Sequence, residues 1–352
     1  MKRRMKVKII ITFGLFLLSF VFLPSLVSAK TSVTATEKWP EAISIGTSPT
    51  LGSVYRLGIG YAKIINKYLG ISVSPEATEG GGFNIAMMAR GEMELGFIQT
   101  VQTYDAYRGV GLYKKLGRQP IRVLWVAHPG PVALATHAYS EIKTPADIRG
   151  KRYMFVVKGA TAQTLYGDAL LEAYGMTRKD CITQTFSGSI ELIDAVKEKK
   201  TDVWHYPGSL VRHAVWEQIT QKADVRFISI GEEQAASIHK KYPQYNFLEF
   251  PSNIYRNQDY SFLTAAWFSK FCCRKDFSEG LAYDITKVCW ENRKELLPLD
   301  PLFGQFDLKS AVDSFNMPFH AGAIRYFKEK GVWGAKQEQL QKNLLQEMGE
   351  VK

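Results

Sequence analysis

The sequence lacks several residue patterns that mark common classes of enzyme. Its six histidines form no His-Glu-x-x-His or other metal-binding spacing. There is no Gly-x-Ser-x-Gly nucleophile turn and no phosphate loop of the Walker type. Gly58-Ile59-Gly60 lies within a helical pattern, so it is not a dinucleotide-binding turn. We therefore expect no catalytic residue, no metal site and no cofactor, and an enzyme is the less favoured alternative.

Cysteine is scarce. The 352 residues include four cysteines, and no two of them form Cys-x-x-Cys. One disulfide is compatible with this number in an exported protein, but the spacing does not pair them. Neighbouring residues of a strand point to opposite faces, so Cys272 and Cys273 are not expected to bond each other. We favour the interpretation that the four cysteines are buried free thiols. They are Cys181, Cys272, Cys273 and Cys289.

The N-terminus has the pattern of a targeting signal. Five Lys and Arg residues within positions 1–8 precede an apolar run, Ile9 to Leu23, which Pro24 ends. Small residues up to Ala29 offer a cleavage site. We predict a signal peptide over residues 1–29 and a periplasmic or otherwise extracytoplasmic protein. The run is short for a membrane span of roughly 20 residues, which disfavours the alternative of a retained anchor.

The charge balance is moderately basic. The formal charge of +11 becomes +6 when the five basic residues of the predicted signal are removed. The other Lys and Arg residues are spread along the chain. They form no dense basic cluster with interleaved aromatic residues, so no nucleic-acid partner is expected. A mildly basic surface favours acidic solutes or an anionic membrane face.

Two strand-turn-helix units stand near the start of the predicted mature chain. In residues 43–55 and again around 79–84, an extended run enters a turn of small residues that opens a helix. Such turns leave backbone N–H groups free at a helix N-terminus, which is a good seat for an anion. In an open α/β sheet they lie at the carboxyl ends of the strands, where ligands bind. The pattern recurs in residues 151–206, which predicts an α/β protein of two similar lobes.

Further elements follow from local signals. Strands are expected at Ile121–Ala127 and Val132–Ala135, on either side of a turn at residues 128–131. Asp276 and Glu279 have the spacing of a capping box, so Asp276 is expected to cap a helix. The amphipathic C-terminal tail is expected to pack against a lobe.

Four segments of the chain resemble, in the same order, the TAXI family of solute-binding proteins, which serve TRAP (tripartite ATP-independent periplasmic) transporters. The segments are Gly46-Thr47-Ser48-Pro49-Thr50-Leu51-Gly52-Ser53-Val54-Tyr55, Glu79-Gly80-Gly81-Gly82-Phe83-Asn84, Gly91-Glu92-Met93-Glu94-Leu95-Gly96-Phe97-Ile98-Gln99 and Pro318-Phe319-His320-Ala321-Gly322-Ala323-Ile324-Arg325-Tyr326-Phe327-Lys328-Glu329. Pro49 and Leu51 stand where the family has small residues, and Gly159-Ala160-Thr161-Ala162 replaces its Gly-Ser-Gly-Thr turn.

The resemblance implies a two-lobed type II periplasmic binding protein fold with two crossover hinge strands, near 123–135 and 257–268. Lobe I would comprise residues 30–135 and 257–352, the latter with a C-terminal helical tail, and lobe II residues 136–256. The ligand would lie between the lobes. The partners implied are a small organic acid and the membrane subunits of a TRAP permease, and a monomer is expected.

Polar residues at the strand-to-helix turns are the candidate ligand contacts, with helix capping as the alternative role for each. In lobe I they are Thr47, Ser48, Ser53, Tyr55, Asn84 and Gln99. In lobe II they are Thr161, Gln163, Thr164, Ser187, Ser189 and Tyr206, of which the resemblance favours Tyr206. A dicarboxylate, a 2-oxoacid, an amino acid and an aromatic acid all suit such a seat. A binding protein of an ABC importer, or a membrane sensor of the same fold, is the alternative within this class.

Overall fold

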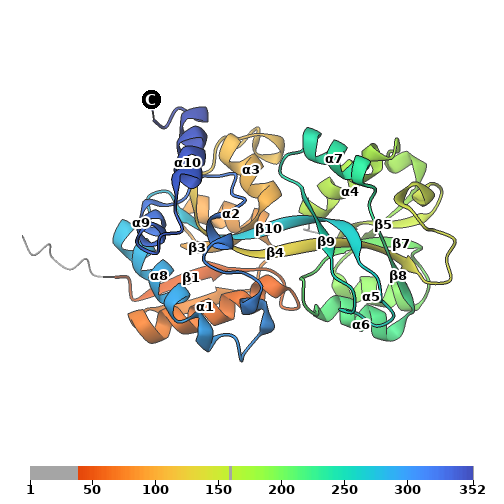
Figure 1. The fold of residues 1–352 in the computed structure, drawn as a ribbon, viewed down its shortest axis with the longest axis horizontal. Coiled ribbons are helices and arrows are strands. Elements are labelled where there is room, and N and C mark those ends of the chain that lie inside the picture. Colours follow the sequence, from red (N-terminus) through yellow and green to blue (C-terminus); the bar gives the residue numbers. More distant parts are fainter. Residues whose placement is uncertain (1–38, 158–160, 352) are drawn as a thin grey trace, which may run out of the picture. The chain divides into compact units, whose positions relative to one another are not determined.

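The computed structural model describes residues 39–157 and 161–351, so the predicted signal peptide lies outside the described residues. A mixed sheet forms its centre (Figure 1), in the order β2-β1-β3-β10-β4-β7-β5-β6, with β8 beside β4 and β9 beside β10. The strands are β1 (Ala42–Gly46), β2 (Ser72–Glu76), β3 (Leu95–Gln99), β4 (Ile121–His137), β5 (Arg152–Val157), β6 (Ile182–Phe186), β7 (Val203–Pro207), β8 (Val225–Ile228), β9 (Asn246–Phe250) and β10 (Phe262–Arg274). The helices are α1 (Ser53–Leu69), α2 (Gly81–Arg90), α3 (Thr100–Arg108), α4 (Thr161–Ala173), α5 (Ser189–Lys197), α6 (Ala214–Lys222), α7 (Glu232–Lys241), α8 (Glu279–Glu291), α9 (Ala321–Glu329) and α10 (Ala335–Glu347).

Two long antiparallel strands, β4 and β10, run through the middle of the sheet. Parallel strands β1, β2 and β3 lie on the β10 side, with α1 and α8 on one face and α2 and α3 on the other (Figure 1). Parallel strands β5, β6 and β7 lie on the β4 side. This arrangement confirms the predicted α/β fold with two crossover strands.

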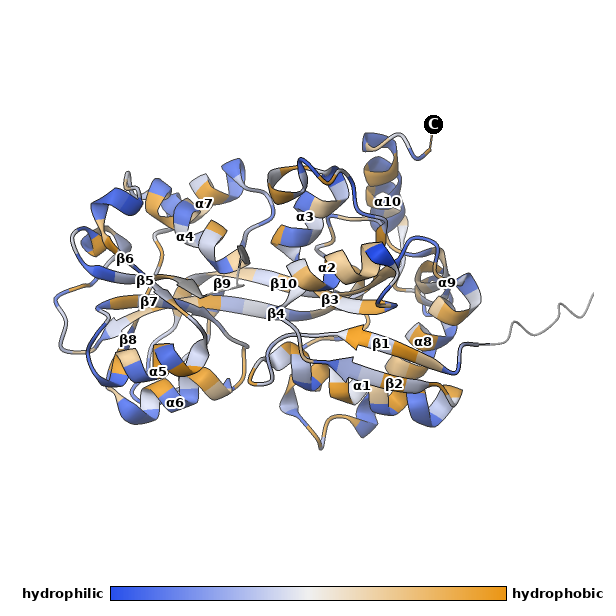
Figure 2. Ribbon diagram, turned by 180° about the vertical axis from the view of Figure 1, so that it is seen from behind, coloured by the Kyte–Doolittle hydropathy of each residue, from blue (hydrophilic) through white to orange (hydrophobic). Residues whose placement is uncertain are grey.

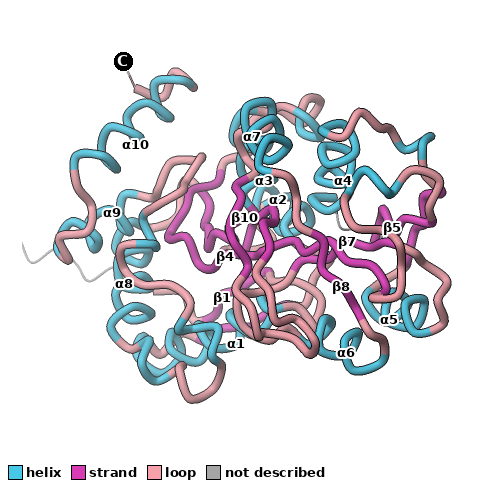
Figure 3. The backbone as a smooth tube through the Cα atoms, turned by 45° about the vertical axis from the view of Figure 1, so that its right-hand side comes forward, coloured by secondary structure: helices cyan, strands magenta, loops and turns pink. Residues whose placement is uncertain are grey.

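The hydrophobic core divides along the same two strands. One cluster gathers residues from 43–127 and 271–348, whereas two others gather residues mainly from 132–267, one on each face of the sheet. Hydrophobic residues concentrate along the strands and the inner faces of the helices (Figure 2). Helices cover both faces of a continuous band of strands, and α10 extends past α9 (Figure 3).

Helix α1 shows how the sequence sets these elements. Its apolar residues recur every three or four positions, and Leu57, Tyr61 and Ile64 are buried. Gly70 ends it in the left-handed conformation at φ 69°. A Cβ at Gly60 would lie 2.3 Å from the ring of Phe303, so the glycine allows close packing at this point.

The turn expected at residues 128–131 does not form. These residues continue β4 without a break, and Pro129 and Pro131 stand opposite Phe268 and Ala266 of β10. Neither proline has an N–H to donate to a hydrogen bond between β4 and β10. The pairing of the two strands also shifts register between Ser269 and Lys270 of β10. The second crossover strand also begins at Phe262 and not near residue 257.

The expected cap of α8 is likewise wrong. The N-cap is Ser278, whose side chain accepts a hydrogen bond from the Leu281 N–H. Asp276 instead pairs with Arg274.

All four cysteines are free thiols, and only Cys181 is not buried. The C-terminal tail packs as expected: the Tyr107 hydroxyl donates to the Leu344 carbonyl at 2.8 Å.

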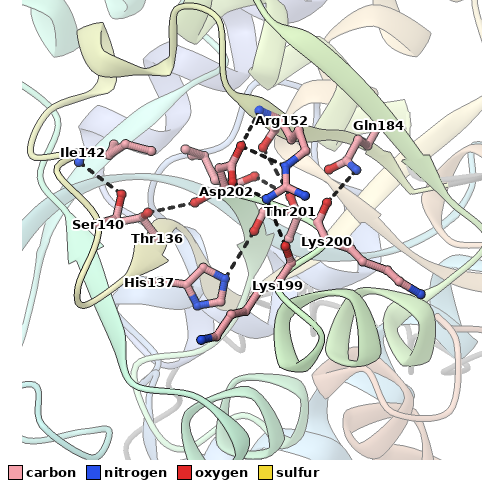
Figure 4. Close-up of polar contacts among 11 residues, drawn as sticks. Thr136, His137, Ser140, Ile142, Arg152, Gln184, Lys199, Lys200, Thr201 and Asp202 are labelled. Carbon is pink, nitrogen blue, oxygen red and sulfur yellow. Dashed lines mark hydrogen bonds and ion pairs between the residues drawn. The ribbon is translucent and has the colours of Figure 1, made fainter.

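The far end of the β4 side is held by a polar network (Figure 4). The Arg152 guanidinium lies 2.6 Å from the Asp202 carboxylate, which also accepts the Arg152 N–H. The Thr136 hydroxyl donates to the Asp202 carbonyl at 2.7 Å. These bonds tie β4, β5 and β7 together at the edge away from the cavity described below. Across the described segments, no helix is both long enough and apolar enough to cross a bilayer.

Candidate binding site

The first wall of the site is the turn between β1 and α1. Gly52 is the N-cap of α1, and no side chain caps the helix there. The turn is closed by a hydrogen bond from the Gly52 N–H to the Pro49 carbonyl at 2.8 Å. The first-turn N–H groups of α1 are therefore left for an outside acceptor.

The second wall is the turn before α2. Its N-cap, Gly80, has φ 111°, a conformation that L-residues rarely adopt, and no side chain caps the helix. A Cβ at Gly81 would lie 2.3 Å from Oε1 of Gln102, so a larger residue there would have to displace the Gln102 side chain. Behind the turn, Asn84 is buried, and its amide donates to the carbonyls of Thr47 and Phe97, each at 2.9 Å.

The opposite walls come from the β4 side of the sheet. The first turn of α4 contributes Ala162 and Gln163, and that of α5 contributes Ser189. Gly188 is the N-cap of α5, again without a side-chain cap. Further out, the Glu191 carboxylate accepts bonds from the Ser187 N–H and hydroxyl at 2.6 and 2.7 Å.

These four helix N-termini open onto one cavity of about 820 Å³. Among the described residues that line it, Glu79 is the one with a formal charge, and no Arg or Lys takes part. Hydroxyls, amides and apolar groups make up the rest. The lining residues are Ser48, Pro49, Leu51, Gly52, Ser53, Val54, Ala77, Thr78, Glu79, Gly80, Gly81, Phe83, Gln99, Gln102, His128, Ala162, Gln163, Ser187, Ser189, Tyr206, Pro207, Gly208, His213, Trp267 and Ser269.

Two buried histidines belong to this wall. The Ser53 hydroxyl lies 3.0 Å from Nε2 of His128. Burial, together with the nearby Arg56 cation, lowers the pKa of His128 to about 4 and that of His213 to about 3. Both rings are neutral at pH 7. A neutral His128 can donate from Nε2 to Ser53 and so leave the Ser53 hydroxyl proton for a ligand.

The lining could hold an anion that also has an apolar body. Helix N-termini attract negative charge through unpaired N–H groups and the helix dipole. Burial raises the pKa of Tyr206, so its hydroxyl stays a hydrogen-bond donor. Trp267 from the crossover strand β10 and Phe83 from α2 supply aromatic surface. No group of three His, Cys, Asp or Glu side chains that could hold a metal occurs within residues 39–157 and 161–351.

The structure brings most of the predicted contacts to the cavity. The seven that line it are Ser48, Ser53, Gln99, Gln163, Ser187, Ser189 and Tyr206. Four others are not in the lining: Thr47, Tyr55, Asn84 and Thr164. The hydroxyl of Thr47 donates to the Glu76 carbonyl at 2.6 Å, so it holds the first turn to β2. The side chain of Thr161, and all of Gly159 and Ala160, lie outside the described residues.

Sequence reasoning missed several lining residues, chiefly His128, His213, Trp267 and Gln102. His128 falls in the segment where the sequence predicts a turn, and no local signal marks Trp267 within its apolar strand. The sequence could have indicated Gln102, because it follows the predicted contact Gln99 by three residues, which is about one helical turn.

A model of the NMT1-like family matches residues 45–331. The chain belongs to the NMT1-like family. The finer assignment to the TAXI family stays a prediction.

Several solved structures are similar to this NMT1-like chain at low sequence identity. The periplasmic aliphatic sulphonate binding protein SsuA from Escherichia coli is 14% identical, with 89% of this chain and 94% of that chain covered and a TM-score of 0.44. PhnD1 from Prochlorococcus marinus, in complex with methylphosphonate, is 12% identical, with 89% and 100% covered and a TM-score of 0.47. XAC2383 from Xanthomonas citri, bound to ATP, is 10% identical, with 86% and 99% covered and a TM-score of 0.49.

Proposed function

We propose that this chain is an extracytoplasmic solute-binding receptor that captures a small organic anion, a carboxylate, without altering it. One observation carries the proposal. Four helix N-termini, two from each side of the β4–β10 pair, open onto a single cavity, and α1, α2 and α5 have no side-chain cap. A carboxylate in that cavity would accept the hydrogen bonds that the helices leave unmade.

The free energies indicate how such a ligand would be held. An anion at one helix N-terminus contributes about 0.3–1 kcal/mol, or about 2 kcal/mol when it is partly buried. Micromolar affinity requires about 8 kcal/mol. The remainder would come from burying the ligand's body against groups such as Trp267, Tyr206 and Leu51, which requires the two sides of the cavity to close on it.

Delivery to a TRAP permease completes the proposal, and the order of the TAXI-like segments supports it. Uptake would then use an ion gradient and no ATP. Uptake by membrane vesicles that contain the receptor and its permease tests this point, with an imposed sodium gradient and without ATP. A strict requirement for ATP hydrolysis would assign the chain to an ABC importer.

A thermal-shift screen tests ligand capture. The predicted mature chain is heated with C4-dicarboxylates, 2-oxoacids, glutamate and aromatic acids, because a tight binder raises the melting temperature by mass action. Ser189→Asp places a carboxylate in the first turn of α5, where it would stabilise the helix but repel an anion. We expect this variant to lose the ligand-induced shift without a lower melting temperature of its own.

Ala335→Asp is the matched control, since it adds the same carboxylate at the first residue of α10, which is not part of the cavity. This variant should keep the full ligand-induced shift. The absence of a shift with every acid, or equal shifts in both variants, would count against an anion seat.

A further inference from the structure

A second surface of the molecule combines exposed aliphatic side chains with positive charge. In residues 110–118, directly after α3, Val110 is 41% exposed, Leu112 is 58% exposed and Leu116 is 72% exposed. The same nine residues carry Lys114, Lys115 and Arg118, all exposed, and no acidic residue. Single exposed hydrophobic residues are ordinary on protein surfaces, but three within seven positions are not.

A buried tyrosine and backbone hydrogen bonds fix the path of this segment. The Tyr113 side chain is buried in the core, so it anchors the segment at its middle. The Tyr113 carbonyl accepts hydrogen bonds from the N–H groups of Leu116 at 3.0 Å and Gly117 at 2.8 Å. Gly111 and Gly117 have φ of 56° and 75°, which favours glycine at both positions. In this conformation the aliphatic side chains face water.

The cations of the segment are available to a partner. Lys114 and Lys115 form no ion pair with any residue in the described part of the chain, whereas Arg118 donates to the Met348 carbonyl at 2.7 Å. Surfaces that bind a bilayer from one side combine apolar residues that enter the headgroup boundary with Lys or Arg residues that face anionic lipids. The charge of residues 110–118 is of one sign and complements such lipids.

We propose that residues 110–118 dock on an anionic phospholipid surface. Val110, Leu112 and Leu116 enter the boundary between headgroups and acyl chains, and Lys114 and Lys115 face the lipid phosphates. This contact is independent of the ligand cavity, because none of these residues lines it. It holds the protein at a membrane face through a weak, salt-dependent association.

Vesicle co-sedimentation tests the proposal. The chain from Lys30, which includes the whole compact unit of residues 39–352, is mixed with vesicles of phosphatidylcholine alone or with about 30% phosphatidylglycerol. We expect binding to the anionic vesicles, weaker binding at high salt, and little binding to phosphatidylcholine. The double variant L112Q/L116Q should lower the partition coefficient about tenfold or more, and K114Q/K115Q should lower it on anionic vesicles only.

The matched control is I182Q/I190Q, which removes two exposed isoleucines, 59% and 67% exposed, from another surface. It should bind vesicles like the parent chain. All three variants change exposed side chains, so their melting temperatures should stay close to that of the parent. Failure of the parent to bind anionic vesicles, or equal binding by L112Q/L116Q, would overturn the lipid assignment.

Discussion

The side-chain nitrogen of Lys270 lies 2.9 Å from the hydroxyl of Thr100, and Lys270 is completely buried. No carboxylate in the described residues pairs with it. The Thr100 hydroxyl also accepts the Phe268 N–H at 2.8 Å. Burial lowers the pKa of Lys270 to about 7. Gln99 and Ser269, the sequence neighbours of Thr100 and Lys270, line the cavity, whereas Thr100 and Lys270 do not.

Lys270 makes stability depend on pH. Its pKa is lower in the folded chain than in the unfolded chain, where it is about 10.4, so between these values the unfolded chain binds the extra proton. The free energy of unfolding therefore rises with pH over this window, by up to about 1.4 kcal/mol per unit. Lys270→Met should remove that slope, as measured by urea unfolding at pH 7, 8 and 9. Lys143→Met, at an exposed lysine, is the control, and parallel curves for parent and Lys270→Met would contradict the prediction.

His128 predicts a loss of stability in acid. Its folded pKa of about 4 lies below its unfolded value of about 6.5, so the unfolded chain takes up the proton first as the pH falls. The stability linked to His128 is present above pH 6.5 and is lost as the pH falls towards 4. His128→Gln should flatten this loss in unfolding measurements, and His239→Gln is the control for removing an imidazole. An unchanged acid profile in His128→Gln would refute the prediction.

Asn84 was predicted as a ligand contact, and its bonds suggest a different role. Its amide joins the first turn, β3 and α2 by donating to the carbonyls of Thr47 and Phe97. Asn84→Ala would leave both carbonyls buried without this donor, which should destabilise the fold by about 2–4 kcal/mol in urea unfolding. Asn343→Ala, at an exposed position of α10, should change the stability by less than about 0.5 kcal/mol. A fully stable Asn84→Ala that has lost ligand binding would restore the contact role.

Closure of the cavity should be visible in solution. The proposed function requires the two sides to approach each other when the ligand is buried. Small-angle scattering on the predicted mature chain should therefore give a smaller radius of gyration at saturation with an acid that raises the melting temperature. An unchanged radius at saturation would show that the ligand is held without closure.

The local pattern of the sequence predicted the repeated units well. Strand-turn-helix order around Gly52 and Gly80 depends on residues close in sequence, and α1 and α2 begin at Ser53 and Gly81, directly after these glycines. Of the candidate contacts on these two turns, Ser48 and Ser53 line the cavity, as expected for turns at the carboxyl ends of strands. Thr47, Tyr55 and Asn84 do not line it.

The errors arose where distant segments decide the structure. Pro129, Gly130 and Pro131 are typical of a turn, but pairing with β10 keeps them extended. Asp276 was expected to cap α8, yet it is taken by Arg274, and Ser278 caps instead. The Ser53–His128 contact joins residues 75 positions apart, so no local signal could reveal it.

The most direct test of the central claim is a crystal structure of the predicted mature chain with an acid that raises its melting temperature. The account predicts the ligand carboxylate within about 2.7–3.2 Å of first-turn N–H groups of α1, α2, α4 or α5, with its body against Trp267 or Tyr206. A carboxylate that faces solvent, or a ligand bound outside this cavity, would contradict it.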